Sequence, residues 1–368
     1  MAEIQDIFNQ LDKSYGDSLN LTQRKAFTAI INCRTAHFGY HRDSCDHCDY
    51  EKFAYNSCRN RNCPKCQTFK KEQWIHKQEQ YLLDIPYFHV VFTLPSELNH
   101  IAYQNQSVVY NLFFKAVSET LKELTFDEKY LGAKLGLTAI LHTWGQNLTY
   151  HPHIHCIIPG GGLTANGKWK NSRTKFFLPV KVLSRKFRGK FLHYLKSAEL
   201  NFYSSTSDLQ NPVNFLNLIS SLHQKEWVVY CKKPFGNAKH VISYLGRYTH
   251  RVAITNNRII SLNDNKVTFS WRDYRDSNKV KVMTLEAEEF SRRFLMHILP
   301  SGFHKIRHYG LLAPRDKLER IIICKRLTGT KIIPFKPKET EDLLRELIGI
   351  DFNKCPQCGI GKLADSPP

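Results

Sequence analysis

The sequence of 368 residues contains no long apolar run. No stretch approaches the roughly 18 consecutive apolar residues of a membrane-spanning helix. The first ten residues, MAEIQDIFNQ, also lack the basic and then apolar layout of a signal peptide. Internal repeats and low-complexity tracts are missing, and apolar residues make up 42% of the chain, which excludes a disordered protein. We therefore expect a folded cytoplasmic protein.

Acidic residues are missing from one long segment. Between Lys129 and Ala198 there is no Asp or Glu, whereas twelve Lys and Arg residues occur there. The whole chain has 53 Lys and Arg against 33 Asp and Glu, a net charge of +20. Such an excess favours a polyanionic partner, most often nucleic acid, and an acid-free segment suits contact with phosphates. In this segment we expect phosphate contacts from Lys168, Lys170, Arg173 and Lys175.

Cysteine is abundant, and its distribution indicates metal binding. Eleven cysteines in an apparently cytosolic chain favour metal over disulfides, and six of them lie between residues 33 and 66. Two C-x2-C knuckles, separated by 14 residues, have a spacing that lets two tight turns present four thiolates to one Zn2+. The predicted ligands of this structural zinc are Cys45, Cys48, Cys63 and Cys66. A possible second zinc site would use the remaining Cys33, His37, His41 and Cys58.

Two further features accompany these knuckles. Basic residues surround the second knuckle and predict a face that contacts DNA, namely Arg59, Arg61 and Lys65. Near the end of the chain, Cys355-Pro-Gln-Cys358 forms a third knuckle that supplies only half of a zinc site. Cys324 with a histidine, or a second subunit, would complete it. Alternatively, it carries no metal.

The order of the predicted elements indicates an α+β fold with an antiparallel sheet. A helical segment over 1–30 and a charged helix at 68–83 flank the cysteine-rich segment. After them come strand 87–94, helix 107–124, strands 137–145 and 153–159, helix 182–200 and strand 226–231. This β-α-β-β-α-β order is the ferredoxin-like arrangement. Further on we expect a helix at 238–251, a hairpin with Asn256–Asn257 at its turn, a strand at 279–285 and a helix at 286–298.

The segment His151-Pro-His153-Ile-His155 predicts half of a metal site. Residues i and i+2 of a strand point to the same face, so His153 and His155 point together. Two imidazoles on one rigid strand are suitable metal ligands. A hairpin brings the end of the preceding strand close to them. Gln146 is the predicted third ligand, and His142 on that strand is the alternative.

Two tyrosines lie one helical turn apart further along the chain. In HVISYLGRYTHR, Tyr244 and Tyr248 are i and i+4 and so share one helix face. A core aromatic stripe is the commoner reason for this spacing. Here Arg247 lies between the tyrosines and Arg251 follows them, which favours contact with DNA. A phenol is a weak nucleophile at neutral pH, and a divalent metal that polarises a phosphate compensates for this.

Together these motifs resemble the HUH superfamily of single-strand endonucleases. More closely, they resemble the rolling-circle transposases of the insertion sequence 91 family. The resemblance covers residues 33 to about 313 and rests on CRTAHFGYH, CDHC, NSCRNRNCPKC, HVVFTLP, TWGQNLTYHPHIH, YLGRYTHRVAITN and GFHKIRHYGLLA, with CPQCG at the end.

The resemblance implies a fold, a chemistry and a partner. The fold is an HUH endonuclease core with an antiparallel ferredoxin-like sheet, an N-terminal zinc-binding module and an α/β C-terminal extension. Four regions are expected. Residues 1–84 form the N-terminal helix and zinc-binding module, and residues 85–258 form the catalytic domain. Residues 259–335 form a hairpin and helix region, and residues 336–368 form a linker and CxxC tail.

In this chemistry His153, His155 and Gln146 bind catalytic Mg2+ or Mn2+, and Zn2+ is structural. Tyr244 and Tyr248 are nucleophiles that form 5′-phosphotyrosine links. The partners are single-stranded DNA at element termini and target DNA, so a bacterial protein of this kind is nucleoid-associated when on DNA. Alternatives are a replication initiator or relaxase with the same chemistry, and a non-catalytic zinc-dependent DNA-binding regulator.

Overall fold

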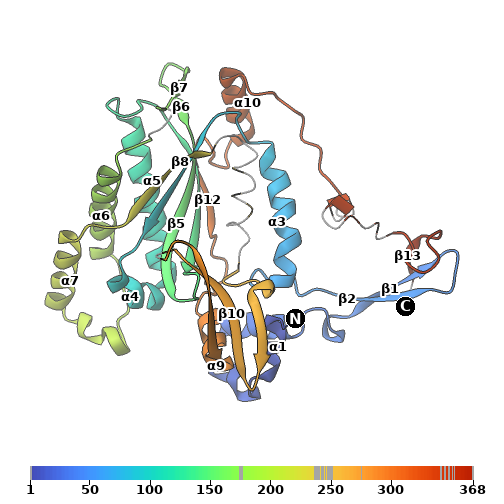
Figure 1. Cartoon of the computed structure of the whole chain (residues 1–368). Helices are drawn as coiled ribbons and strands as arrows, with labels where there is room; N and C mark the ends of the chain where they lie inside the picture. Colours follow the sequence, from blue (N-terminus) through green and yellow to red (C-terminus); the bar gives the residue numbers. More distant parts are fainter. Residues whose placement is uncertain are drawn as a thin grey trace.

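The computed structural model describes residues 2–173, 177–235, 241, 244, 246, 252–274, 276–339, 342–343, 345–346, 349, 351 and 353–366. A central antiparallel sheet is flanked by helices on both faces (Figure 1). Smaller sheets lie beside it, so the predicted mixture of helices and antiparallel sheets is confirmed. None of the described helices is long and apolar enough to span a lipid bilayer.

Five strands form the central sheet, in the order β12-β4-β5-β3-β8. Their bounds are Tyr87–Thr93 for β3, Gly136–Trp144 for β4, Tyr150–Pro159 for β5, Val229–Phe235 for β8 and Ile306–Gly310 for β12. Every neighbouring pair is antiparallel. Strand β12 comes from far along the chain and pairs with β4, so residues after the predicted catalytic region complete the sheet.

Helices α5 (Gln106–Phe126) and α6 (Val180–Lys196) cover one face of this sheet, and α7 (Pro212–Gln224) packs on α6. The short α4 (Asn99–Gln104) lies at their end. The apolar residues of α5 recur every three or four positions, which gives it one buried stripe. That stripe meets Ile154, Cys156 and Ile158 of β5 in the main hydrophobic core. The alternation along β5 therefore directs its odd-numbered residues to the opposite face.

The N-terminal helices pack against the region after residue 252. Helix α1 (Ile4–Gln10) and helix α2 (Leu21–Ile31) share a hydrophobic cluster with a three-stranded sheet and the helix that follows it. Those elements are β9 (Ile259–Asn263), β10 (Lys266–Asp273), β11 (Lys279–Glu286) and α9 (Ala287–Leu295).

The hairpin turn predicted at Asn256–Asn257 lies elsewhere. Asn256–Arg258 forms a 3-10 turn before β9, and the chain reverses at Asp264 and Asn265. Both turn residues have positive φ, 48° and 59°, as the tightest hairpin turns require.

The cysteine-rich segment forms a hairpin followed by a helix. The hairpin consists of β1 (Tyr40–Cys45) and β2 (Glu51–Tyr55), and the helix is α3 (Pro64–Glu79). The C-terminal strand β13 (Leu363–Ser366) pairs with β1, so the last part of the chain shares one small sheet with the cysteine-rich segment. In Figure 1 this sheet projects from the body of the molecule. The other strands and α-helix of the described residues are β6 (Gly161–Leu163), β7 (Trp169–Asn171) and α10 (Lys317–Thr328).

Candidate functional site

Three histidines gather on the face of the sheet opposite α5 and α6. Strands β4 and β5 place His142 directly opposite His153, and Ile140 opposite His155. Directly opposite residues share a face, so the three imidazoles project together. One ring nitrogen of each of His142, His153 and His155 lies within 4.8 Å of the others. His142 and His155 are buried and His153 is half-buried, so the group has one accessible side.

The third member of this cluster is His142, which was the alternative to Gln146. Gln146 lies in the turn beyond Trp144 and Tyr150, the last pair of the hairpin. Its side-chain amide donates a hydrogen bond to the Tyr274 hydroxyl at 3.0 Å. Gln146 lies two residues past the end of β4. The register shows that the residue directly opposite His153 is the one that meets it.

A fourth histidine, which the sequence reasoning missed, adjoins the cluster. His89 is buried on β3, and its Nε2 lies 2.9 Å from Nδ1 of His155. The two rings are stacked, with centroids 5.1 Å apart. A signal was present in the sequence, because His89 is the one imidazole in the otherwise apolar strand YFHVVF. Its odd position on β3 gives it the same face as His153 and His155.

Tyr244 lies beside His89. Its hydroxyl is 2.9 Å from Nε2 and 3.1 Å from Nδ1 of His89, and the two ring centroids are 4.7 Å apart. The tyrosine is half-buried and packs with Ile140 and Ile157 of the sheet and with Trp74 of α3. Tyr244, His89 and His155 therefore form a continuous series of contacts that leads from the predicted nucleophile to the histidine cluster.

The residues that carry Tyr244 pack closely against α3. Gly246, two residues further on, faces α3, where an added Cβ would lie only 2.3 Å from Cδ1 of Ile75. The helix after the cysteine-rich segment thus packs directly against the residues that carry the tyrosine. The other predicted residues of this region, Arg247, Tyr248 and Arg251, lie outside the described residues, as does Lys175.

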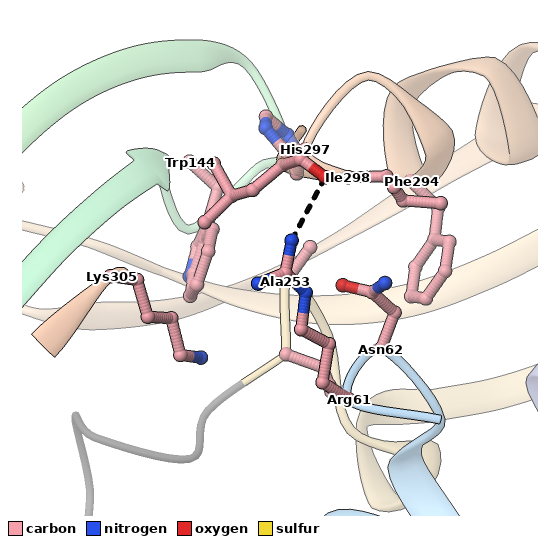
Figure 2. Close-up of a pocket in the computed structure, with 10 residues that line it drawn as sticks. Arg61, Asn62, Trp144, Ala253, Phe294, His297, Ile298 and Lys305 are labelled. Carbon is pink, nitrogen blue, oxygen red and sulfur yellow. Dashed lines mark hydrogen bonds between the residues drawn. The ribbon is translucent and has the colours of Figure 1, made fainter. Parts of the chain in front are cut away.

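A small pocket borders the cluster. The indole of Trp144 stacks on His142, with centroids 4.7 Å apart and planes inclined by 18°. Trp144 also lines a cavity of about 20 Å3, together with Arg61, His297 and Lys305 (Figure 2). Burial, with the nearby charge of Arg61, lowers the pKa of the Lys305 ammonium to about 8.

Arg61 and Lys65, two of the predicted DNA contacts, have protein partners. The Arg61 guanidinium donates to the carbonyl oxygens of Leu299, Pro300 and Phe303. These bonds tie the cysteine-rich segment to the loop before β12. Lys65 pairs with Glu3 at 2.5 Å.

Other predicted phosphate contacts are accessible. The side chain of Arg59 is exposed. Lys168, Lys170 and Arg173 are also exposed, on or beside the hairpin of β6 and β7. The structure therefore leaves these four side chains accessible to a large partner.

The first cysteine cluster comprises Cys33, Cys58, Cys63 and Cys66. Their Sγ atoms lie 3.6 Å apart for Cys33 and Cys66, 3.6 Å for Cys58 and Cys66, and 3.7 Å for Cys63 and Cys33. Sulfurs around a tetrahedral zinc with Zn–S bonds of about 2.3 Å lie about 3.8 Å apart. The cluster thus has the size of a zinc site.

The predicted zinc site built from both N-terminal knuckles is wrong in its pairing. Cys63 and Cys66 meet Cys33 and Cys58, whereas Cys45 and Cys48 meet Cys355 and Cys358 in a second cluster. The first knuckle lies at the turn of the hairpin of β1 and β2, whereas the second lies at the start of α3, so the hairpin carries the first knuckle away from the second. His37 and His41 are exposed and belong to neither cluster.

The chain is similar to two family models and to curated transposases. A family model described as "Putative transposase" matches residues 136–319, and one described as "Transposase zinc-binding domain" matches residues 3–94. The curated "Putative transposase y4qJ" of Sinorhizobium fredii (strain NBRC 101917 / NGR234) is 45% identical over 373 residues, which cover 98% of this chain and 94% of that protein. The chain belongs to the insertion sequence 91 family of transposases.

A second relative of this transposase is the "Transposase for insertion sequence element IS801" of Pseudomonas savastanoi pv. phaseolicola. It is 29% identical over 344 residues, which cover 90% of this chain and 80% of that protein. The predicted family, the transposase function and the zinc-binding domain are therefore confirmed.

Two solved structures of the conjugative relaxase TrwC in complex with oriT DNA are more distant. The copper-bound complex has a TM-score of 0.25 and 13% identity, and covers 32% of this chain and 45% of that chain. The complex with mutant oriT DNA has a TM-score of 0.26 and 11% identity, and covers 66% of this chain and 74% of that chain.

Proposed function

We propose that this transposase cleaves and rejoins single-stranded DNA with Tyr244 as a nucleophile next to a metal ion held by His142, His153 and His155. The observation that carries the proposal is the series of contacts from the Tyr244 hydroxyl through His89 to His155, with neighbouring atoms 2.9 Å apart at each step. A core tyrosine would have no need of a histidine cluster at its hydroxyl.

The scaffold of the site supports this proposal. Strands β3, β4, β5 and β8 follow the chain order β-α-β-β-α-β and lie in the sheet order β4-β5-β3-β8. We propose that they form a ferredoxin-like core of the HUH type, with β12 as an added edge strand. The helices on one face then stabilise the sheet, and the histidines on the other face remain available for chemistry.

The donor set is suited to a transition-metal ion. Three imidazoles with no carboxylate among them are a typical set for such ions, whereas Mg2+ prefers oxygen ligands. Of the two predicted ions, Mn2+ is therefore the better match. When bound, the ion would polarise the scissile phosphate and offset the charge that develops there.

Tyr244 then carries out the cleavage step. The Tyr244 oxygen attacks phosphorus, and the bond from phosphorus to the 3′ oxygen breaks. The phenol loses its proton and the departing 3′ oxygen gains one, so a 5′-phosphotyrosine and a free 3′ hydroxyl result. Because the new phosphodiester keeps the energy of the old one, attack by another 3′ hydroxyl rejoins DNA. We propose the same role for Tyr248, at the second strand transfer.

His89 is a positioning residue in this scheme. Its hydrogen bond to Nδ1 of His155 leaves Nε2 as the nitrogen of His155 that can bind a metal. Its second contact orients the Tyr244 hydroxyl. Removing such a partner of a metal ligand typically costs about 10- to 100-fold in affinity or activity.

Basic residues away from the metal site would hold the DNA strand. Arg59, Lys168, Lys170 and Arg173 are exposed and suited to phosphate contacts, which add affinity without reading sequence. Since the substrate is DNA, we propose that the protein works in the bacterial cytoplasm at the nucleoid, on element termini and target DNA.

The test is covalent capture of DNA. A labelled single-stranded oligonucleotide carrying the end of the element that encodes this chain is incubated with protein and Mn2+, and adducts are resolved under denaturing conditions. We expect an adduct with the wild-type protein and loss of the adduct with Tyr244→Phe/Tyr248→Phe. Each single variant shows which tyrosine acts on this strand. Tyr203→Phe changes an exposed tyrosine and is the matched control. An undiminished adduct in the double variant would refute the proposal.

A further inference from the structure

We infer that Cys45, Cys48, Cys355 and Cys358 bind a second zinc ion, which fastens the C-terminal tail to the N-terminal hairpin. The four thiols come from opposite ends of the chain and form one group whose sulfurs all lie within 4.8 Å of one another. Sγ of Cys45 is 3.7 Å from that of Cys358, and Sγ of Cys48 is 3.8 Å from that of Cys355. Around a tetrahedral zinc the expected separation is about 3.8 Å.

Backbone hydrogen bonds to sulfur show that both knuckles have the conformation of metal-binding turns. The amide of His47 donates to Sγ of Cys45 at 3.4 Å, and the amide of Gly361 donates to Sγ of Cys358 at 3.3 Å. Such bonds stabilise thiolates, which are the form that binds zinc. All four cysteines are free thiols. Four thiols this close would repel one another once ionised, and a divalent cation removes that repulsion.

The two knuckles are also fitted to each other. A Cβ on Gly361 would lie 2.4 Å from Sγ of Cys45, so only glycine allows this approach. The Lys362 amide donates to a carboxylate oxygen of Asp46 at 2.7 Å, and the Asp46 amide donates to the Lys362 carbonyl at 3.1 Å. These contacts join the turns themselves, and they do not depend on the strands that follow.

The strand pairing extends the same junction. Leu363 lies opposite Cys45 and Ser366 lies opposite Arg42, so β13 becomes the third strand of the hairpin sheet. This small sheet has few buried side chains, so its own packing contributes little stability. A metal ion commonly supplies the stability that such a small module lacks.

The inferred site differs from each earlier explanation of the C-terminal knuckle. Cys324, a possible partner from the sequence, is buried in an apolar cluster with Leu83 and Leu311. The zinc-binding family model covers residues 3–94 and so omits the tail. The ligands also belong to one chain, so no second subunit is needed to complete the site.

The experiment counts zinc ions per chain in the full-length protein purified under reducing conditions, by mass spectrometry of the metal. We expect Cys355→Ser/Cys358→Ser to contain one zinc fewer than the wild type. Cys45→Ser/Cys48→Ser should lose the same ion. The quadruple variant should also lose only one, because all four thiols serve a single site. Cys231→Ser, which changes a half-buried cysteine of β8, is the matched control and should keep the wild-type content.

Limited proteolysis gives a second measurement that does not depend on metal analysis. We expect the tail to be cleaved faster in Cys45→Ser/Cys48→Ser, although these substitutions lie about 300 residues away in the sequence. A wild-type zinc content in the tail variant would overturn the inference. Loss of two zincs in the quadruple variant, with one lost in each double variant, would also overturn it, because it would mean separate sites.

Discussion

The two faces of the central sheet are built from the same strands but differ completely in chemistry. On β5, Ile154, Cys156 and Ile158 point to α5 and α6 and are fully or almost fully buried in an apolar core. Their neighbours His153 and His155 point the other way, to His142 and His89. A change of one position in the sequence therefore separates a residue that stabilises the fold from one that serves the reaction.

The largest expected effect comes from the face that carries the histidines. Changing His153→Ala removes one of three imidazoles from a half-buried position. We expect adduct formation to fall by about a thousandfold, which corresponds to about 4 kcal/mol of transition-state stabilisation. The thermal unfolding temperature should stay near that of the wild type. If the variant unfolded at a much lower temperature and its folded fraction still formed as much adduct as the wild type, His153 would serve the fold and not the reaction.

A second substitution tests the apolar face of the sheet, which α5 and α6 cover. Phe113 of α5 is fully buried against Phe187 and Phe191 of α6. Changing Phe113→Ala should reduce the free energy of unfolding by about 3 kcal/mol, because it removes apolar contacts and leaves a cavity. Denaturant titration measures this loss. Adduct formation per folded molecule should remain within about twofold, and a much larger change would show that this face also shapes the site.

A smaller effect is expected where α3 meets the residues that carry Tyr244. The Cβ of Gly246→Ala would overlap Cδ1 of Ile75 and move the tyrosine away from His89. We expect about a tenfold loss of adduct formation. In the double variant Gly246→Ala/Ile75→Ala the overlap disappears and most of the activity should return. Equal activity losses in the single and double variants would assign the effect to the new methyl group alone.

The smallest effect concerns a histidine outside the cluster. His297 is buried, with Nδ1 near Thr143 and Nε2 near the Leu148 carbonyl, and burial lowers its pKa to about 4. In the unfolded state this imidazole has a pKa of about 6.5, so as the pH falls it takes up a proton there before it does in the folded state. The free energy of unfolding therefore decreases below about pH 6.5. Between pH 7 and pH 5.5 this histidine should lower the free energy of unfolding by about 1 kcal/mol. Urea titrations of the wild type and of His297→Gln at several pH values measure this contribution. If the free energy of unfolding had the same pH dependence in both, the effect would not come from His297.

Local patterns in the sequence predicted the sheet and half of the site. The alternation in HVVF and HIHCII predicted β3 and β5, and the i, i+2 spacing predicted that His153 and His155 point together. The third imidazole could be named only as an alternative, because the choice between His142 and Gln146 depends on strand register. Register is set by the turn, and Gly145 to Thr149 do not reveal it by composition.

Contacts between distant segments could not be predicted from the sequence. The spacing of the cysteines was correct for zinc, but spacing does not say which knuckles meet. Nothing near Cys45 indicates that its partner is Cys358, 313 positions further on. His89 was missed for a similar reason, because its importance comes from a neighbouring strand and from Tyr244, which is 155 positions away.

The hydrophobic cluster shared by α1, α2 and α9 has a consequence for biosynthesis. Phe8 of α1 packs on Phe294 of α9, with ring centroids 5.7 Å apart. A ribosome that adds about 5 to 20 residues per second needs roughly 15 to 60 seconds to proceed from the first of these rings to the second. Throughout that interval the apolar side of α1 that contacts α9 in the folded protein stays uncovered. The N-terminal part of this transposase is thus among the first to be made but cannot finish folding until most of the chain has followed.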